Sequence, residues 1–317
     1  MRTSNTSRTS GVSRMPRTSG TSISLRAGTV LAGAGALGLV WVGMPSAAAI
    51  VGGKPVGDGE RPFVVQIQQR GDDGTWSHYC GGALVDSRVV VTAAHCAKWA
   101  EQGKVTIRVV LGRSDSGTGQ GTVVTRKHFT VHSHPAFSTE TNTDLGLVVL
   151  DTPARQRSAS LPPLGARPEV GRVLRAAGWG RTDLNSEAKP TRLQEAALPV
   201  TEFDTEGGTW DKNFLCAGAP EVRVGPGDSG GPLFAPPSPG GTVAHGTGGT
   251  VAHRTGKAVV HGLVTGDTNT CPGLFTNLAD PALWKPFRAV LAAKGLAHVI
   301  PAVTPGRATG KPQQNLR

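Results

Sequence analysis

The sequence predicts an all-β fold, from its composition and from the spacing of its apolar runs. Glycine accounts for 44 of the 317 residues and aromatic residues for only 5%. From Ile50 onward, short apolar runs alternate with Gly, Asp and Pro, among them FVVQI, VTIRVVLG, LGLVVLD and AVVHGLVTG. Strand-length runs separated by turn residues are typical of barrels and sandwiches. A Pro-, Ser- and Arg-containing stretch at 153–172 predicts a connector between two β units of similar size.

One helix is expected, near the end of the chain. It opens on Asp280, with Pro281 as its first helical residue, and it closes at Gly295. The low-complexity segment 235–256, in which GGTVAH occurs twice, predicts an exposed hairpin loop. The basic, Pro- and Gly-containing tail at 298–317 is expected to be disordered.

Residues 1–49 have the pattern of a secretory signal peptide. Five Arg and no acidic residue accompany an apolar run at 27–44, which the small residues PSAAA follow. A membrane anchor is the alternative, but the run is Gly-rich, borderline in length and closed by an Ala-x-Ala site. We therefore expect a secreted, extracellular protein with no stable membrane anchor.

The formal charge of +11 raises the question of a nucleic-acid partner. The charge is concentrated at the two ends, because residues 50–300 carry 25 basic and 22 acidic residues. A body with a net charge of only +3 is consistent with a solvated basic surface, and no nucleic-acid partner is expected.

Four cysteines in an exported chain predict two disulfides, since the number is even. They are Cys80, Cys96, Cys216 and Cys271. A zinc site is the alternative, but no Cys-x-x-Cys spacing supports it. His245 and His253 in the repeated segment lack a third ligand, so no metal and no cofactor are expected.

Ser229 is the candidate nucleophile, in the string GPGDSGGPLF. A nucleophilic serine needs its hydroxyl exposed on a sharp turn, with backbone N–H groups free to stabilise an oxyanion. Small neighbours permit both, and Gly227 and Ser229 would supply the two donors of an oxyanion hole. The alternative is an ordinary Gly-rich turn.

His95 and Asp144 are the candidate partners of Ser229. His95 follows a strand and precedes Cys96, so a covalent staple would limit the drift of a general base. Asp144 heads an apolar strand, from which its carboxylate could orient the imidazole and stabilise the imidazolium. The order His, Asp, Ser along the chain distinguishes this arrangement from those of subtilisins and α/β-hydrolases, which use other orders.

Together these motifs resemble the trypsin/chymotrypsin family of secreted serine endopeptidases, of the bacterial trypsin-like kind. The matching strings, in family order, are IVGG (50–53), CGGALV (80–85), TAAHC (92–96), DLGLVVL (144–150), AAGWG (176–180), GDSGGPLF (227–234) and GLVTG (262–266). The resemblance implies a chymotrypsin-like domain at 50–297, with two packed six-stranded antiparallel β-barrels at about 50–160 and 170–280 and a C-terminal helix.

The family also implies pairs of residues. Cys80 and Cys96 match its disulfide beside the catalytic His, and Cys216 and Cys271, the two left over, are expected to pair beside the specificity pocket. A free amino group on Ile50 would pair with the carboxylate of Asp228 and order the oxyanion turn. Because SAAA directly precedes IVGG, signal peptidase alone would expose Ile50. Cutting slightly earlier, with trimming by an aminopeptidase, is the alternative.

The expected specificity pocket departs from the family pattern. Arg223 falls on or near the floor position that is Asp in trypsin-like members. Gly266 stands where the family usually has Trp, and Asp267 follows it. Thr265 retains a hydroxyl where the family has a Ser that supports the catalytic Asp. Gly273 is the last of the residues expected to bind substrate, after Arg223, Thr265, Gly266 and Asp267.

Cleavage after Lys or Arg is therefore not expected to dominate, and small apolar or acidic residues are favoured. The alternative is that Arg223 points into solvent and that Glu221 or Asp267 supplies a negative charge.

The sequence thus predicts a monomeric endopeptidase whose partners are protein or peptide substrates and protein inhibitors. The competing function is a catalytically silent homologue that serves as a binding module.

Overall fold

The computed structural model describes residues 50–138, 143–202, 213–237, 239–244, 250–254 and 256–303, and for 239–244 and 250–254 it describes the backbone only. The expected signal peptide, most of the expected basic tail, and His245 lie outside these residues. No described helix is both long enough and apolar enough to span a bilayer.

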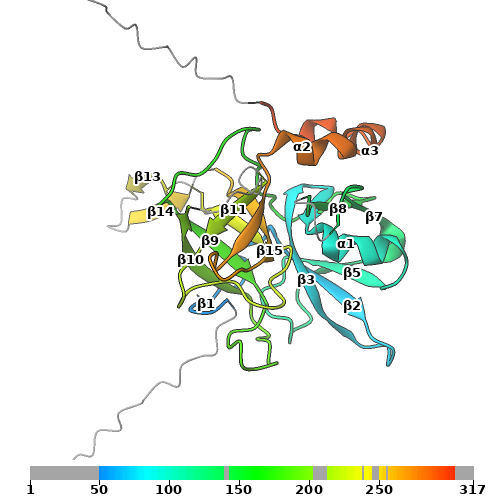
Figure 1. Ribbon diagram of the computed structural model, residues 1–317, viewed down its shortest axis with the longest axis horizontal. Coiled ribbons are helices and arrows are strands. Elements are labelled where there is room, and N and C mark those ends of the chain that lie inside the picture. The colour runs from blue at the N-terminus through cyan, green and yellow to red at the C-terminus, as the bar shows by residue number, and fades with distance from the viewer. Residues whose placement is uncertain are drawn as a thin grey trace, which may run out of the picture. The chain divides into compact units, whose positions relative to one another are not determined.

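Two antiparallel sheets of seven strands make up most of the described chain (Figure 1). The first has the order β6-β5-β2-β3-β4-β8-β7. Its strands are β2 (Val64–Arg70), β3 (Trp76–Asp86), β4 (Val89–Thr92), β5 (Ile107–Leu111), β6 (Thr122–Thr125), β7 (Phe129–Ser133) and β8 (Gly146–Leu150).

The second sheet has the order β1-β10-β11-β16-β15-β12-β9, and β9 also pairs with β10, so six strands close into a barrel. Its strands are β1 (Lys54–Pro55), β9 (Val173–Gly178), β10 (Gln194–Thr201), β11 (Phe214–Ala217), β12 (Pro232–Ala235), β15 (Val259–Gly266) and β16 (Leu274–Asn277). The all-β prediction is confirmed. The first sheet differs from a six-stranded barrel, since β6, largely exposed, forms one open edge.

Two interior strands of the first sheet, β4 and β8, consist largely of apolar residues, many of them β-branched. Every residue of β4 (VVVT) and of β8 (GLVVL) is buried. Such strands read as continuous apolar runs, because both of their faces are covered. The second barrel encloses its own cluster of buried side chains, which includes Leu174, Leu198, Leu215, Leu233 and Phe275.

Helices cover little of the molecule. α1 (Ala94–Glu101) follows β4 and was not expected from the sequence. The predicted C-terminal helix is present as α2 (Pro281–Trp284) and α3 (Arg288–Ala293), separated by the 3₁₀ turn Lys285–Phe287. Pro286 lies in that turn and has no N–H to continue an α-helical ladder. The other 3₁₀ turns are Arg126–His128 and Ala297–Val299.

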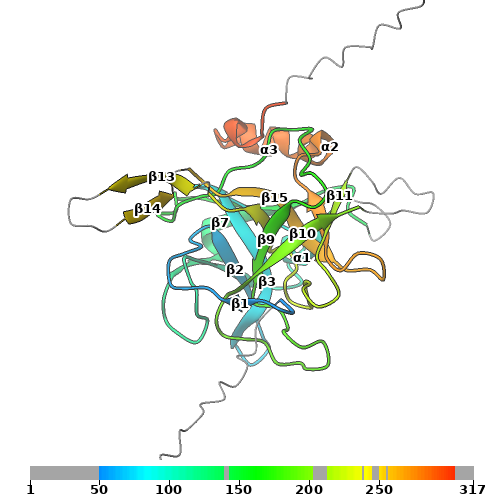
Figure 2. The ribbon, with the colours of Figure 1, turned by 90° about the vertical axis from the view of Figure 1, so that its left-hand side faces the viewer.

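The expected hairpin in the low-complexity segment is also present. β13 (Pro239–Ala244) pairs with β14 (Thr250–Arg254) in a separate two-stranded ribbon. Figure 2 shows this ribbon projecting from the side of the second barrel. The side chain of His253 lies outside the described residues.

Both expected disulfides are formed. Cys80 on β3 is bonded to Cys96 on α1, with Cα atoms 6.4 Å apart, and encloses a separation of 16 residues. Cys216 on β11 is bonded to Cys271, with Cα atoms 5.7 Å apart, and encloses 55 residues. The second bond therefore ties β11 to the loop that precedes β16.

Removing each disulfide should cost stability in the order of the loops that they close. By loop entropy, Cys80→Ser/Cys96→Ser should lose about 3 kcal/mol and Cys216→Ser/Cys271→Ser about 4 kcal/mol of unfolding free energy. Denaturant titration of the two double variants beside the parent measures both losses. A larger loss from the shorter loop would show that native-state strain outweighs chain entropy.

Candidate active site

Strand pairing alone brings His95 close to Asp144. β4 and β8 are antiparallel neighbours, with Thr92 at the end of β4 opposite Gly146 at the start of β8. The chain leaves β4 into α1 just where it enters β8, so residues shortly after Thr92 lie beside residues shortly before Gly146. A side chain on Gly146 would meet the Cβ of Ala97 at 2.6 Å, which explains the glycine at this close contact of α1 with β8.

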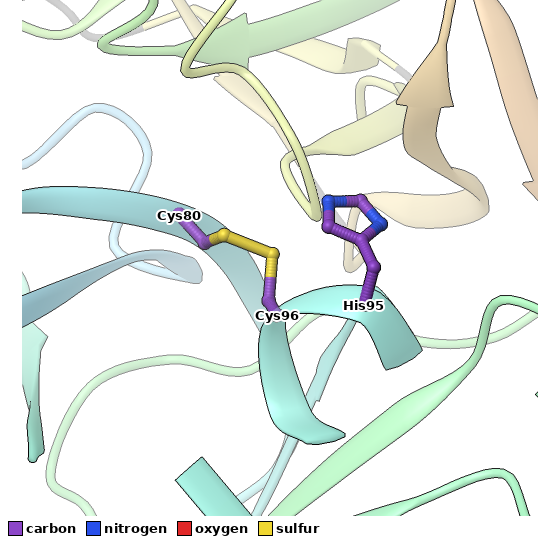
Figure 3. A group of neighbouring side chains, drawn as sticks. All are labelled: Cys80, His95 and Cys96. Atoms are coloured by element: carbon purple, nitrogen blue, oxygen red, sulfur yellow. A yellow bond between two sulfur atoms is a disulfide. The ribbon is translucent and has the colours of Figure 1, made fainter. Parts of the chain in front are cut away.

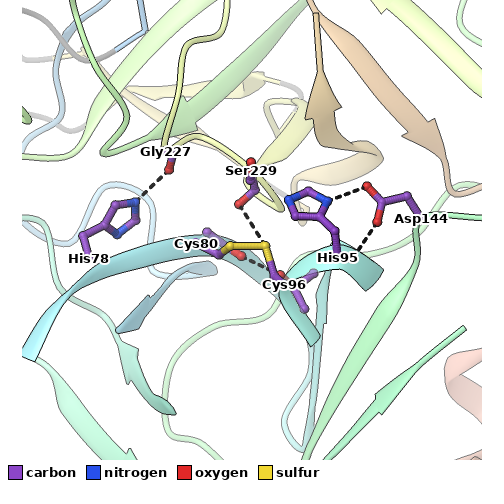
Figure 4. Close-up of a disulfide and its surroundings, with 9 residues drawn as sticks. His78, Cys80, His95, Cys96, Asp144, Gly227 and Ser229 are labelled. Carbon is purple, nitrogen blue, oxygen red and sulfur yellow. Dashed lines mark hydrogen bonds and ion pairs between the residues drawn. A yellow bond between two sulfur atoms is a disulfide. The ribbon is translucent and has the colours of Figure 1, made fainter. Parts of the chain in front are cut away.

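Two hydrogen bonds join His95 to Asp144 (Figure 4). The backbone N–H of His95 donates to Asp144 Oδ1 at 2.9 Å, and the ring Nδ1 lies 2.9 Å from Oδ2. The carboxylate can only accept, so Nδ1 carries the proton and Nε2 is left as a proton acceptor. The Asp144 side chain is 3% exposed and the His95 side chain 34%, so the acid is sheltered while the ring reaches solvent.

A threonine on β16 supports Asp144 from behind. Thr276 Oγ1 donates to the backbone carbonyl of Asp144 at 3.1 Å. Thr265 Oγ1 lies 2.7 Å from Thr276 Oγ1 and must be the donor in that pair, because Thr276 has already used its one hydroxyl proton. Thr265 thus acts on Asp144 through Thr276, a residue that the sequence analysis did not identify.

Close backbone contact fixes the turn that carries Ser229. The carbonyl of Ser229 accepts a hydrogen bond from Gly81 N–H on β3 at 2.7 Å. Gly230 has φ +76°, and a side chain there would meet Thr92 Oγ1 at 2.4 Å and Gly81 O at 2.6 Å. A side chain on Gly81 would in turn meet Gly231 Cα at 2.8 Å. The glycines beside Ser229 are therefore needed for the two sheets to meet at this point.

The donors proposed for the oxyanion hole are free. Within the described ranges, neither the N–H of Gly227 nor that of Ser229 donates to another protein atom. Gly227 has φ +100°, a conformation that favours glycine. The Ser229 hydroxyl likewise has no partner among the described residues, and Figure 4 places Ser229 on the side of the His95 ring opposite Asp144.

The disulfide Cys80–Cys96 lies against His95 (Figure 3). One ligand-type atom each of Cys80, His95 and Cys96 falls within 4.8 Å of the others, a spacing that metal sites share. Both sulfur atoms are bonded to each other, so neither is the thiolate that a metal would need. The disulfide therefore ties the start of α1 to β3.

His78 is a second histidine at the site and was missed from the sequence. Its Nε2 lies 2.8 Å from the Gly227 carbonyl and therefore donates to it. Its Nδ1 is buried without a partner. The pKa of His78 is lowered to about 4, chiefly by burial; the bond to Gly227 partly offsets this lowering, and the charge of Lys189 adds to it. A neutral His78 thus holds the oxyanion turn from the β3 side.

Ile50 and Asp228 are both fully buried. Asp228 accepts hydrogen bonds from the backbone N–H groups of Gly180, at 2.8 Å, and Gly225, at 3.0 Å. Burial nevertheless raises the pKa of the Asp228 carboxyl to about 7, against the lowering effect of those two donors and of the charge of Lys189. Ile50 has φ +61°, which is costly for a β-branched residue.

The expected pocket residues lie on two neighbouring segments. Arg223 and Asp267 line one hollow, whereas Gly266 has open space where a side chain would stand. A side chain on Gly273 would meet Ala217 O at 2.6 Å, so only glycine allows β16 to approach β11 here.

Replacing His78 tests its role through pH. In His78→Gln, the amide can still donate to the Gly227 carbonyl but does not titrate. The folded-state pKa of His78 lies below its unfolded value, so the parent should lose stability as the pH falls from about 6.5 to about 4. Relative to the variant, that loss should reach about 3 kcal/mol.

The measurement is the unfolding free energy of both proteins between pH 8 and pH 4. Contributions of Asp228 and of other shared groups cancel in the difference. A difference that does not change with pH would show that His78 is solvated and titrates normally.

Comparison with known proteins places the chain in a family. The family model for trypsin matches residues 50–284. Chymotrypsin-like elastase family member 1 of Bos taurus is 33% identical over 201 residues, or 59% of this chain and 73% of that protein. Granzyme F of Mus musculus is 32% identical over 208 residues (62% and 81%), and chymotrypsin-like elastase family member 3B of Homo sapiens is 33% identical over 201 residues (58% and 72%). This chain therefore belongs to the trypsin family of serine proteases.

Proposed function

We propose that this protein is a secreted endopeptidase that hydrolyses peptide bonds with Ser229 as nucleophile, His95 as general base and Asp144 as the group that orients His95. The observation that carries the proposal is the pair of hydrogen bonds from His95 to the two oxygens of buried Asp144. They fix the imidazole in the tautomer whose Nε2 can accept a proton from a serine.

The reaction follows from these positions. As the Ser229 hydroxyl oxygen bonds to the peptide carbonyl carbon, His95 Nε2 takes the hydroxyl proton and the carbonyl electron pair moves onto oxygen. The unpaired N–H groups of Gly227 and Ser229 are suited to stabilise that oxyanion. His95 then gives its proton to the leaving nitrogen, which leaves an acyl-enzyme. Water, deprotonated by His95, attacks the ester carbonyl carbon, and His95 returns that proton to the Ser229 oxygen as the bond between this oxygen and the carbonyl carbon breaks.

A catalytically silent homologue that binds peptides is the competing proposal. The altered pocket, with Arg223 and Gly266, is what favours it. A fluorophosphonate probe separates the two, because it reacts only with a serine that is activated as a nucleophile. Labelling that depends on Ser229 supports the peptidase.

We further propose that cleavage before Ile50 completes the site. Among the described residues no cation lies within 4.0 Å of the Asp228 carboxylate, although the charge of Lys189 acts on it, and a free amino group on buried Ile50 would supply a direct partner. Cleavage would also remove the preceding carbonyl, against which the positive φ of Ile50 is strained. Pairing should then lower the pKa of Asp228 from its raised value.

Ser229→Ala should abolish peptide hydrolysis while the fold persists. The Ser229 hydroxyl has no hydrogen-bond partner in the described ranges, so its loss should leave the melting temperature within about 2 °C of the parent. The kcat/KM for a protein substrate should fall by roughly four orders of magnitude or more. Ser87→Ala, at another partly buried serine, serves as the matched control. Retention of more than a few percent of activity would mean that another residue is the nucleophile.

N-terminal sequencing of the exported protein should find Ile50 as the first residue of the active form. The small-x-small pattern of Ala47 and Ala49 is the reason to expect cleavage there. Asp228→Asn in that form should lose about 3 to 5 kcal/mol of unfolding free energy, because the buried amino group would be left uncompensated. A stable, active form that begins upstream of Ile50 would contradict this activation scheme.

A further inference from the structure

A hollow of about 490 Å³ lies between the segment that precedes Ser229 in the chain and the segment that follows β15. Its lining consists of Pro220, Arg223, Asp267, Thr268, Asn269 and Pro272. Two segments form its walls, one before Ser229 in the chain and one directly after β15.

Both walls lead into the turn that carries Ser229. Arg223 lies six residues before Ser229 on one continuous segment. On the other wall, Val264 exchanges hydrogen bonds with the glycines after Ser229: Gly230 N–H donates to Val264 O at 2.7 Å, and Val264 N–H donates to Gly231 O at 2.9 Å. Asp267 follows three residues later. The hollow is therefore positioned to receive a side chain of a peptide whose carbonyl lies at Ser229.

Arg223 brings an uncompensated positive charge to this hollow. Its backbone N–H donates to Val51 O at 3.2 Å, which fixes the residue on the wall. Its side chain has no acidic partner among the described residues, and its Nε is buried without an acceptor. An unpaired buried donor costs free energy that an incoming acceptor would recover.

Asp267 is the only acidic residue in the lining, and its negative charge would repel an anionic ligand that Arg223 attracts. It does not form an ion pair with Arg223 within 4.0 Å. Asp267 is exposed, whereas Arg223 is partly buried. Water and salt screen an exposed charge more strongly than a sheltered one, so Arg223 should dominate the interaction with a charged side chain.

We propose that this hollow binds the side-chain carboxylate of a glutamate or aspartate at the substrate position whose carbonyl Ser229 attacks, and that Arg223 is the residue that determines this specificity. The inference rests on the proposed peptidase function and narrows it to one substrate class. The guanidinium can donate two parallel hydrogen bonds to a carboxylate. A lysine or arginine side chain would meet a like charge, and an apolar one would leave Nε unpaired.

Peptides that differ only at the residue before the cleaved bond test the proposal. Glu and Gln have nearly the same shape, so their ratio of kcat/KM isolates the charge, and Leu and Arg complete the series. We expect the exported protein to prefer Glu over Gln by at least about tenfold and to cleave the Arg peptide more slowly than either. Raising the salt concentration should reduce the Glu preference.

Three variants assign the preference to its residue. Arg223→Gln should bring the Glu-to-Gln ratio close to one, and Arg223→Glu should favour the Arg peptide. Asp267→Asn should keep or increase the Glu preference. The matched control is Arg155→Gln, at an exposed arginine outside the hollow, which should leave the ratio unchanged. Melting temperatures show whether each variant folds, and the peptide series on the parent and on Asp267→Asn still tests the proposal if the Arg223 variants do not fold.

Fluorophosphonate labelling of Ser229 separates the two ways of failing. If Ser229 is labelled but Glu and Gln peptides are cleaved equally well, the carboxylate proposal is wrong and the peptidase function stands. A preference for Arg that disappears in Asp267→Asn would overturn the proposal and assign specificity to Asp267. If Ser229 is not labelled, the proposed function and this inference both fail.

Discussion

The site depends on one close backbone contact between the two sheets. Gly81 on β3 donates its N–H to the carbonyl of Ser229, and Gly230 and Gly231 approach too closely for any of these positions to carry a side chain. His95 and Asp144 belong to the first sheet and its flanking helix, whereas Ser229 precedes β12 of the second. A methyl group at Gly81 or Gly230 would push these two sets of residues apart.

The two buried aspartates near the site differ in how their charge is compensated. Asp144 lies beside the His95 ring, so in the proposed reaction its charge would stabilise the imidazolium that forms when the ring takes a proton. Asp228 accepts two backbone hydrogen bonds in the described chain, and its pKa is raised by burial, which these bonds and the charge of Lys189 only partly offset. In the proposed function, Asp144 would act during the reaction and Asp228 during the assembly of the site.

Much of the fold could be predicted because strand and helix signals are local. The VVVT and GLVVL runs and the Asp280–Pro281 helix start can each be recognised within a few residues, and the two disulfides could be predicted from the even number of cysteines. Candidate site residues stood out for the same reason, since Ser229 lies in a rare glycine-rich string. The α1 helix was missed, because AAHCAKWAE is short and carries no capping side chain at its start.

What the sequence did not reveal depends on contacts between residues far apart in the chain. His78 has no distinctive local pattern, and its bond to Gly227 spans 149 residues. Thr276 supports Asp144 across 132 residues. Such roles follow from strand register and burial, which a linear pattern does not specify.

The Cys216–Cys271 bond has a consequence for how peptides would be received. It fixes the end of the segment 267–271 to the barrel, and part of that segment lines the hollow. A peptide that enters the neighbouring hollow would then not have to order that segment on arrival, and binding would lose less conformational entropy. When the wall of the hollow is already ordered, the chemistry of the substrate side chain should determine the selectivity, and the flexibility of the substrate should have little effect on it.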